Sequence, residues 1–99
     1  AGSQALVRKV ILAFLDDAPS ALARMRAAVQ EQNATELRRV AHGMKSASAN
    51  VGAERLSRLC KAMEAGGGAT LLEEADAELR RVADALRAEL DREVPHASR

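Results

Sequence analysis

The chain has 99 residues, which suits one domain with a single hydrophobic core. Its apolar content comes mainly from Leu and Ala, and Phe14 is its one aromatic residue, so the composition favours packed helices over strands. The formal net charge of +1 and the lack of an aromatic platform for base stacking argue against nucleic acid as a partner. The low net charge and the short apolar runs also argue against a membrane.

The first third of the chain predicts two helices, divided near Asp16–Pro19. The earlier helix covers roughly residues 4–16, where apolar residues recur at helical spacing. Its expected apolar stripe consists of Leu6, Val10, Ala13 and Phe14. A carboxylate followed by proline in the first turn is typical of a helix start, so a second helix is expected from here to about Glu31. Its expected apolar residues are Leu22, Met25 and Val29.

The middle of the chain predicts two helices that meet at Gly52. Asn33 and Glu36 have the spacing of a capping box, in which each side chain bonds the backbone N–H of the other residue, so the third helix is expected to begin there. Gly52 is expected to end that helix with a sharp corner. The expected buried residues are Leu37, Val40, Ala41, Met44, Ser48 and Val51 in the third helix and Leu56, Leu59, Cys60 and Met63 in the fourth.

A long last helix is predicted after the glycine triplet of residues 66–68. Thr70 and Glu73 form a second capping-box pattern, and Pro95 marks the expected limit of the helix. The expected apolar stripe consists of Leu72, Ala75, Leu79, Val82, Ala83, Leu86 and Leu90. Residues 1–3 resemble an expression-tag remnant, so we expect the bundle to span residues 4–94 and residues 95–99 to be disordered.

The predicted helices are amphipathic and their connections are short, which favours antiparallel neighbours. We therefore expect an all-α fold, an antiparallel up-down four-helix bundle with an additional N-terminal helix, and a monomer. Cys60 has no second cysteine to pair with and is expected to be a small buried hydrophobe. His42 and His96 are far apart in the sequence, so spacing predicts no metal site.

His42 is the residue most suggestive of chemistry. At about 100° per residue, with Leu37 at zero, the buried stripe of the third helix falls within roughly 60°, whereas His42 lies at roughly 140°. The histidine is therefore expected to be exposed. Its neighbours one turn away include Arg38, Arg39 and Lys45, and no carboxylate lies within one turn on the same helix.

These surroundings suit a histidine that carries a phosphoryl group. Nearby positive charge favours the neutral imidazole, whose nitrogen lone pair is nucleophilic, and the same charges stabilise a bound phosphoryl group. The small residues Gly43, Ser46, Ala49 and Ala53 keep the flanking surface low enough for a partner with a recessed aspartate. From spacing alone, however, an exposed histidine on a helix is more often an ordinary surface residue, and small serines are more often packing residues.

The run from Ala41 to Ala53, AHGMKSASANVGA, resembles the signature of histidine-containing phosphotransfer (HPt) domains, which reads roughly A-H-x-L-K-[GS]-[SA]-[SA]-x-x-[LV]-G-A. The family pattern continues as L-x-x-x-C-x-x-x-E, which Leu56, Cys60 and Glu64 match. The similarity covers most of the chain. Met44 replaces the commoner leucine and Ser46 the common glycine, and both replacements preserve approximate size.

The resemblance implies a function as well as a bundle fold. The position matching His42 receives a phosphoryl group from the aspartate of one response-regulator receiver domain and gives it to another, and the position matching Lys45 neutralises the phosphoryl charge. Arg38, Arg39, Ser46 and Ala49 are expected to contact the receiver.

The resemblance also implies that the domain itself holds no cofactor, because magnesium would come from the acidic site of the receiver. No kinase activity of its own is expected. Such domains usually form the C-terminus of bacterial hybrid sensor histidine kinases or act as free cytoplasmic shuttles. We expect the former arrangement, with this domain on the cytoplasmic side and without direct membrane contact.

Two other functions stay open. The dimerisation and phosphoacceptor domain of an autokinase typically has acidic and proline residues after its histidine, whereas Gly43, Met44 and Lys45 follow here. The triplet at residues 66–68 also lacks the Lys-Ser/Thr that would complete a P-loop. A bundle that binds a receiver without accepting phosphate would have the same residues around His42.

Overall fold

The computed structural model of this chain describes residues 2–93, which form four helices and no strand. They are α1 (Gly2–Gln30), α2 (Ala34–Asn50), α3 (Glu54–Glu64) and α4 (Ala69–Glu93). The prediction of an all-helical domain is confirmed for these residues. The expected helix limit at Pro95 and the expected disordered tail at 95–99 lie outside the described residues, as does the first residue of the expected tag remnant.

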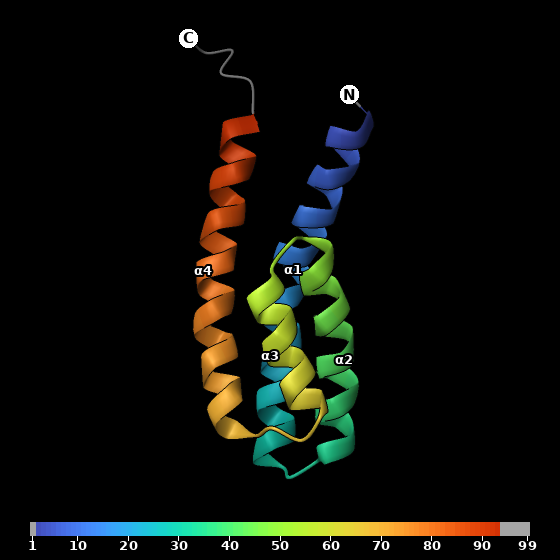
Figure 1. The fold of residues 1–99 in the computed structure, drawn as a ribbon, viewed down its shortest axis with the longest axis vertical. Helices are drawn as coiled ribbons and strands as arrows, with labels where there is room; N and C mark the ends of the chain where they lie inside the picture. The colour runs from blue at the N-terminus through green and yellow to red at the C-terminus, as the bar shows by residue number, and fades with distance from the viewer. Residues whose placement is uncertain (1, 94–99) are drawn as a thin grey trace.

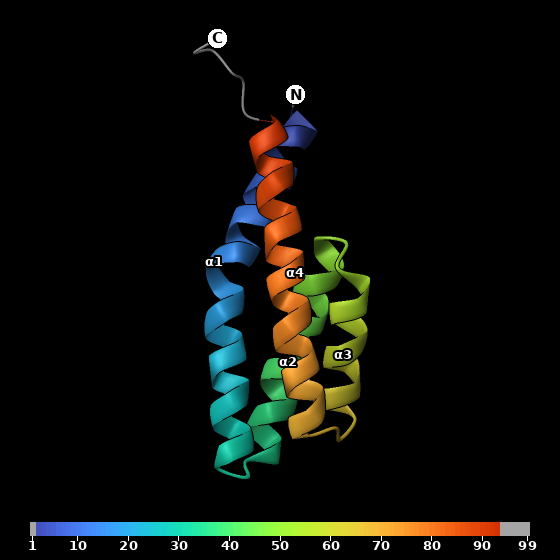
Figure 2. The same ribbon diagram turned by 90° about the vertical axis from the view of Figure 1, so that its left-hand side faces the viewer.

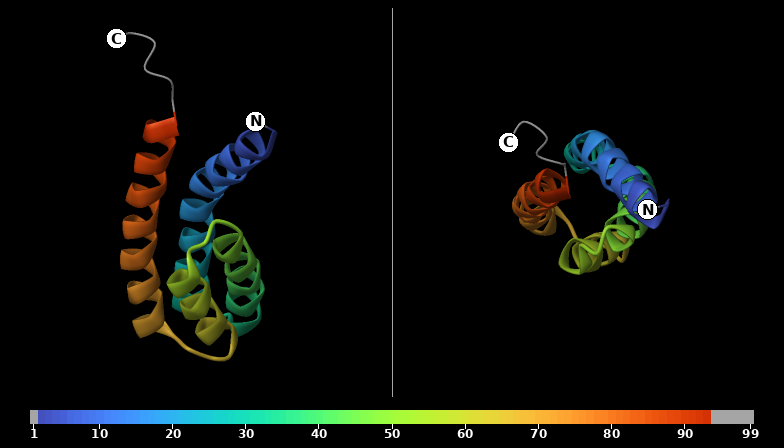
Figure 3. Two further views of the ribbon diagram at one scale, coloured as in Figure 1. Left: turned by 45° about the horizontal axis from the view of Figure 1, so that its top comes forward. Right: turned by 90° about the horizontal axis from the view of Figure 1, so that it is seen from above.

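The helices form a ring in which each one packs on two neighbours, as Figure 3 shows from above. In Figure 1 the chain runs down α1, up α2, down α3 and up α4, so that successive helices run in opposite directions. The two longest helices, α1 and α4, extend beyond α2 and α3 at the end of the molecule where the termini lie (Figure 2). In the part of the chain that the structure describes, this end therefore consists of α1 and α4 without α2 and α3.

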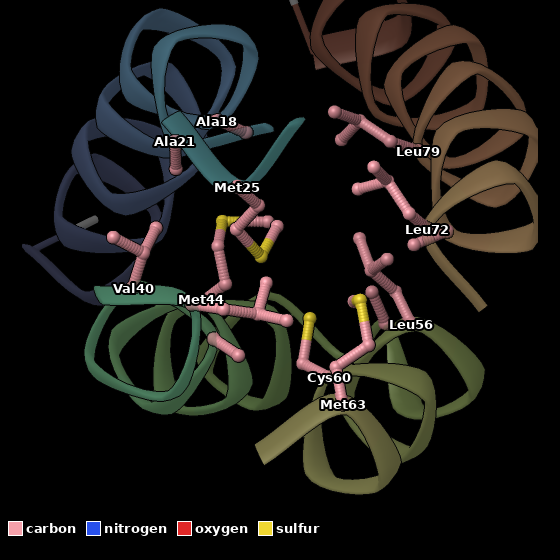
Figure 4. Packing of buried hydrophobic residues seen from close by; sticks show 14 of the residues in the cluster. Ala18, Ala21, Met25, Val40, Met44, Leu56, Cys60, Met63, Leu72 and Leu79 are labelled. Atoms are coloured by element: carbon pink, nitrogen blue, oxygen red, sulfur yellow. The ribbon is translucent and has the colours of Figure 1, made fainter. Parts of the chain in front are cut away.

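The hydrophobic core lies inside this ring, where side chains from all four helices meet (Figure 4). The largest fully buried side chains are Met25, Leu56, Met63, Cys60 and Ser48. The stripes predicted for α2, α3 and α4 are confirmed at most positions. The exceptions, which are only partly buried, are Val51, Leu59, Ala83 and Leu86. Cys60 is buried as expected, and its burial raises the pKa of the thiol to about 11.

The predicted break near Asp16–Pro19 is wrong, because α1 continues through the proline. The reason is packing: buried residues recur at helical spacing on both sides of it. They are Phe14, Ala18, Ala21 and Met25. Pro19 itself is exposed, so the backbone hydrogen bond that it cannot donate is lost on the solvent side of the helix, where water can replace it. What was expected as an additional N-terminal helix is the first part of α1.

The stripe predicted for that first part is also wrong at two positions. Leu6 is 63% exposed and Ala13 is exposed, whereas Ile11 is buried. Helix α2 ends at Asn50, short of the first turns of α1 (Figure 1), so the apolar side chains of those turns have less to pack against.

The helix ends follow the predicted signals only in part. Asn33 caps α2, because its side-chain oxygen accepts a hydrogen bond of 3.0 Å from the backbone N–H of Glu36. The reciprocal bond of a capping box is absent, because the Glu36 carboxylate binds Arg39 instead. The corner after α2 is confirmed by Gly52, whose φ of 78° is in the left-handed region. Thr70 is not a cap, because α4 already begins at Ala69.

Candidate functional site

The candidate site lies on the outer side of the hairpin formed by α2 and α3. Helix α2 turns its apolar stripe into the core, and this orientation leaves His42 facing solvent. The His42 side chain is 64% exposed, which confirms the expectation from helical geometry. An imidazole this open is accessible to a partner as large as a protein domain.

A carboxylate from α3 organises the site. One oxygen of Glu64, Oε2, lies 2.6 Å from Nδ1 of His42, and the other, Oε1, accepts a hydrogen bond of 2.8 Å from Nζ of Lys45. Lys45 and Glu64 are largely covered, with 29% and 27% of their side chains exposed. We call these three side chains the His42–Glu64–Lys45 cluster. The basic neighbours expected from α2 are therefore joined by a negative charge from the neighbouring helix, which contacts the imidazole.

The local sequence explains why Glu64 reaches this position. The left-handed Gly52 reverses the chain, so α3 folds back along α2. Ser57 then donates a hydrogen bond of 2.9 Å from Oγ to the backbone oxygen of Lys45 and joins the two helices beside the cluster. Cys60 and Met63 are buried, so the last turn of α3 is held against the core while Glu64 lies at its edge.

The contacts of Glu64 define which nitrogen of His42 can react. The hydrogen bond from Lys45, followed by the one with His42, holds the pKa of the Glu64 carboxyl below its usual 4.5. An ionised carboxylate can only accept hydrogen bonds, so the proton of a neutral His42 ring lies on Nδ1. The lone pair is then on Nε2, the nitrogen not bonded to Glu64. The arrangement therefore suits nucleophilic attack by Nε2.

The other predicted site residues lie around the cluster without joining it. Arg39 donates two hydrogen bonds, of 2.9 and 2.8 Å, to Glu36, so its charge is paired one turn before His42 rather than directed at the ring. Arg38, Ser46 and Ala49 are exposed, and helical register places them on the same side of α2 as His42. The structure thus brings Lys45 to His42 through a shared carboxylate, and leaves the two arginines outside the cluster.

Glu64 is the residue that the sequence interpretation missed. It matches the last position of the L-x-x-x-C-x-x-x-E pattern, but helical register gives only the neighbours of His42 on its own helix and therefore assigns Glu64 no role. The available signal was its register with Ser57, seven residues earlier, on the side of α3 that faces α2.

Among the side chains that the structure describes, no group of three or more from His, Cys, Asp or Glu could hold a metal ion. None of the four helices in this range is both long and apolar enough to cross a membrane.

Comparison with known families gives one match. The sequence profile described as the Hpt domain matches residues 9–94, a span that includes His42, Lys45 and Glu64. No curated protein and no solved structure matches the chain.

Proposed function

Because this chain belongs to the Hpt domain family, we propose that His42 accepts a phosphoryl group from the aspartate of one receiver domain and passes it to the aspartate of another. Histidine phosphotransfer in a two-component phosphorelay is what the family implies. The observation that supports His42 as the carrier is its exposed imidazole, whose Nδ1 lies 2.6 Å from a carboxylate that is also bonded to Lys45.

The proposed transfer uses Nε2 of His42 as the nucleophile. Its lone pair attacks the phosphorus of the aspartyl phosphate, an N–P bond forms, and the P–O bond to the aspartate breaks, so the aspartate leaves as a carboxylate. The ring keeps its proton on Nδ1 and becomes positively charged. Glu64, 2.6 Å from that nitrogen, stabilises the new charge. Transfer to the second receiver follows the same steps in reverse.

Lys45 is proposed to stabilise the phosphoryl group. Its Nζ lies 2.8 Å from Glu64, on the carboxylate shared with His42, so a rotation of its flexible side chain can bring the ammonium toward phosphoryl oxygens on Nε2. Arg38, Arg39, Ser46 and Ala49 are proposed to lie under the docked receiver. This placement is supported by the exposure of these four residues and by their register on α2.

The context of the domain is proposed from its family alone. Magnesium is supplied by the acidic site of the receiver, and the domain acts as a monomer without kinase activity of its own. It works in the cytoplasm, as the C-terminal part of a bacterial hybrid sensor kinase. These statements are what the resemblance to the Hpt family implies.

A labelling experiment tests the proposed carrier. A panel of receiver domains carrying labelled aspartyl phosphate is incubated with the wild-type domain, with His42→Gln and with His96→Gln, which removes the other of the two histidines. We expect acid-labile, base-stable label on the wild type and on His96→Gln and none on His42→Gln. The exposed His42 side chain makes no core contacts that the substitution would remove, so the variant should fold.

Three outcomes would contradict the proposal. Label on His42→Gln would show that another residue is the acceptor. Labelling by ATP alone would favour an autokinase domain. Unchanged regulation of the partner by a His42→Ala variant that still binds it would favour a non-catalytic interaction module.

A further inference from the structure

The proposed transfer changes the charge of the His42–Glu64–Lys45 cluster. Before transfer, a neutral imidazole lies beside one carboxylate and one ammonium, so the charges of the three side chains cancel. After transfer, the ring is positively charged, and the phosphoryl group on Nε2 brings a charge of about −2. The cluster then has an excess of negative charge, because the one ammonium is shared by Glu64 and the phosphoryl oxygens. Another cation near His42 would restore the balance.

The basic residues of α2 differ in their ability to supply this charge. Arg39 donates two hydrogen bonds to Glu36, so its charge is already paired. Arg38 lies one turn before His42, and side chains on a helix lean toward its N-terminus, so Arg38 leans away from the imidazole. Within α2, only Lys45 both follows His42 by one turn and leans back toward it.

Lys61 of α3 lies across the hairpin from His42. The two helices are antiparallel (Figure 1), and the hydrogen bond from Ser57 to the backbone oxygen of Lys45 fixes their relative level. Four residues farther along α3, a distance of about 6 Å, Lys61 is therefore level with residue 41 of α2. Its side chain leans toward the N-terminus of α3, and because the helices are antiparallel, this direction takes it past His42.

The register of α3 places Lys61 on the face that contacts α2. With Ser57 at zero and about 100° per residue, Lys61 lies at about 40° and Glu64 at about −20°. Ser57 and Glu64 are partly buried and both bond to α2, whereas Lys61 is exposed. Among the side chains that the structure describes, no carboxylate forms an ion pair with Lys61. Its charge is therefore available to an incoming anion.

We propose that Lys61 is the second cation of the phosphorylated site and binds, together with Lys45, the phosphoryl oxygens on Nε2 of His42. This inference rests on the proposed phosphotransfer function and extends the site to a residue on the neighbouring helix. Lys45 is held by Glu64, 2.8 Å from its Nζ, whereas the flexible Lys61 side chain can reach the phosphoryl group without breaking an ion pair. The phosphoryl group is then held by both helices of the hairpin.

Variants of Lys61 and of a matched surface cation test the proposal. Lys61→Met removes the charge and keeps an apolar side chain, and Lys61→Arg keeps the charge. Arg58→Met removes an exposed cation of α3 that lies about 60° farther from the α2 face. Each variant is labelled at His42 by a phosphorylated receiver and by the small donor phosphoramidate, which needs no docking. Phosphorus NMR then measures the pKa of the phosphoryl group on His42.

We expect Lys61→Met to slow labelling by both donors about three- to tenfold, because the phosphoryl group loses one of two cations at a contact that water partly screens. The pKa of the phosphoryl group should rise, since a nearby positive charge favours its ionised form. Lys61→Arg and Arg58→Met should match the wild type in both measurements. The midpoint of thermal unfolding should stay within about 4 °C in all three variants, because the substitutions are exposed.

Other outcomes would overturn the inference in distinguishable ways. Slow transfer from the receiver with normal phosphoramidate labelling and an unchanged phosphoryl pKa would make Lys61 a contact of the receiver instead. Equal losses in Lys61→Met and Arg58→Met would indicate an effect of net charge. Wild-type rates and pKa in Lys61→Met would exclude Lys61 from the site and leave phosphotransfer by His42 intact. A wild-type domain that neither donor labels at His42 would reject the proposed function itself.

Discussion

Two glutamates in this domain have similar contacts and different surroundings. Glu64, at the end of α3, is shared by His42 and Lys45 of α2. Glu78, in α4, is bonded by Arg81 of the same helix and lies 3.6 Å from Nε of Arg55 in α3. Both carboxyls have a lowered pKa, caused first by a hydrogen bond from a cationic side chain. Their exposures differ, at 27% for Glu64 and 8% for Glu78.

The two glutamates differ in the chemistry of the side chains that contact them. The two arginines at Glu78 stay protonated and have no lone pair to offer, so their contacts can only hold α3 and α4 in place. At Glu64, one partner is an imidazole that is 64% exposed and has a free nitrogen. A carboxylate between two basic side chains therefore indicates a reactive site only where one of those side chains is nucleophilic and is exposed to a reaction partner.

The largest difference between the two clusters should follow removal of Lys45. We expect Lys45→Ala to slow phosphoryl transfer to His42 by about 10–100-fold, because the phosphoryl charge loses its nearest cation. Arg55→Ala, the matching change at Glu78, should leave the transfer rate unchanged. Rapid-quench measurement of labelled phosphate checks both rates, and equal rates for wild type and Lys45→Ala would remove Lys45 from the site.

A smaller effect is expected from exchanging the carboxylates themselves. Glu64→Gln should slow transfer about tenfold, because an amide can still orient the imidazole but cannot balance its positive charge. It should lower the free energy of unfolding less than the same change at Glu78, since the Glu64 side chain is 27% exposed against 8% for Glu78 and water can replace part of its contacts. Glu78→Gln should have the opposite pattern, with normal transfer and a loss of about 1–2 kcal/mol in unfolding free energy, because a buried charge-assisted hydrogen bond is weakened.

Urea unfolding and transfer assays on the same two variants supply the controls for each other. A loss of transfer in Glu78→Gln, or a loss of stability confined to Glu64→Gln, would mean that the assignment of one carboxylate to chemistry and the other to structure is reversed.

The smallest expected effect concerns titration. Glu64 has a folded-state pKa below its ordinary 4.5, so its ionised form stabilises the fold above that pH, and this stabilisation is lost as the pH falls through the folded-state pKa. Lys45→Ala should raise the pKa of Glu64 toward 4.5, since Lys45 is the main cause of the shift. The carboxyl resonance of Glu78 should not move in this variant. Carboxyl-detected NMR titration measures the pKa of both carboxyl groups. An unchanged pKa of Glu64 in Lys45→Ala would contradict the hydrogen bond between Lys45 and Glu64.

Most of the fold could be predicted because helical periodicity and turn residues act locally. Gly52 and Asn33 end and begin helices through their own backbone geometry and side chains, without help from distant residues. The continuous α1 could not be predicted this way, because the proline signal is local whereas the packing that overrides it is not. Only the burial of Phe14, Ala18 and Met25 against other helices explains why the helix does not break.

The candidate site was predictable to the same extent. The exposure of His42 follows from the register of one helix, and its basic neighbours can be read from the same segment. The contact with Glu64 depends on how far α3 folds back and on the rotation of its last turn, which are set by packing between helices. The pairing of Arg39 with Glu36 depends only on α2, since Glu36 lies one turn earlier on the same helix.

The contacts that shape the His42–Glu64–Lys45 cluster are all short in sequence. They join residues 22, 19 and 12 positions apart, and they belong to the hairpin of α2 and α3. Loops of this length close quickly and at low entropic cost, whereas the hydrophobic core also needs α1 and α4. The reactive centre can therefore assemble early in folding, before the first and last helices complete the core.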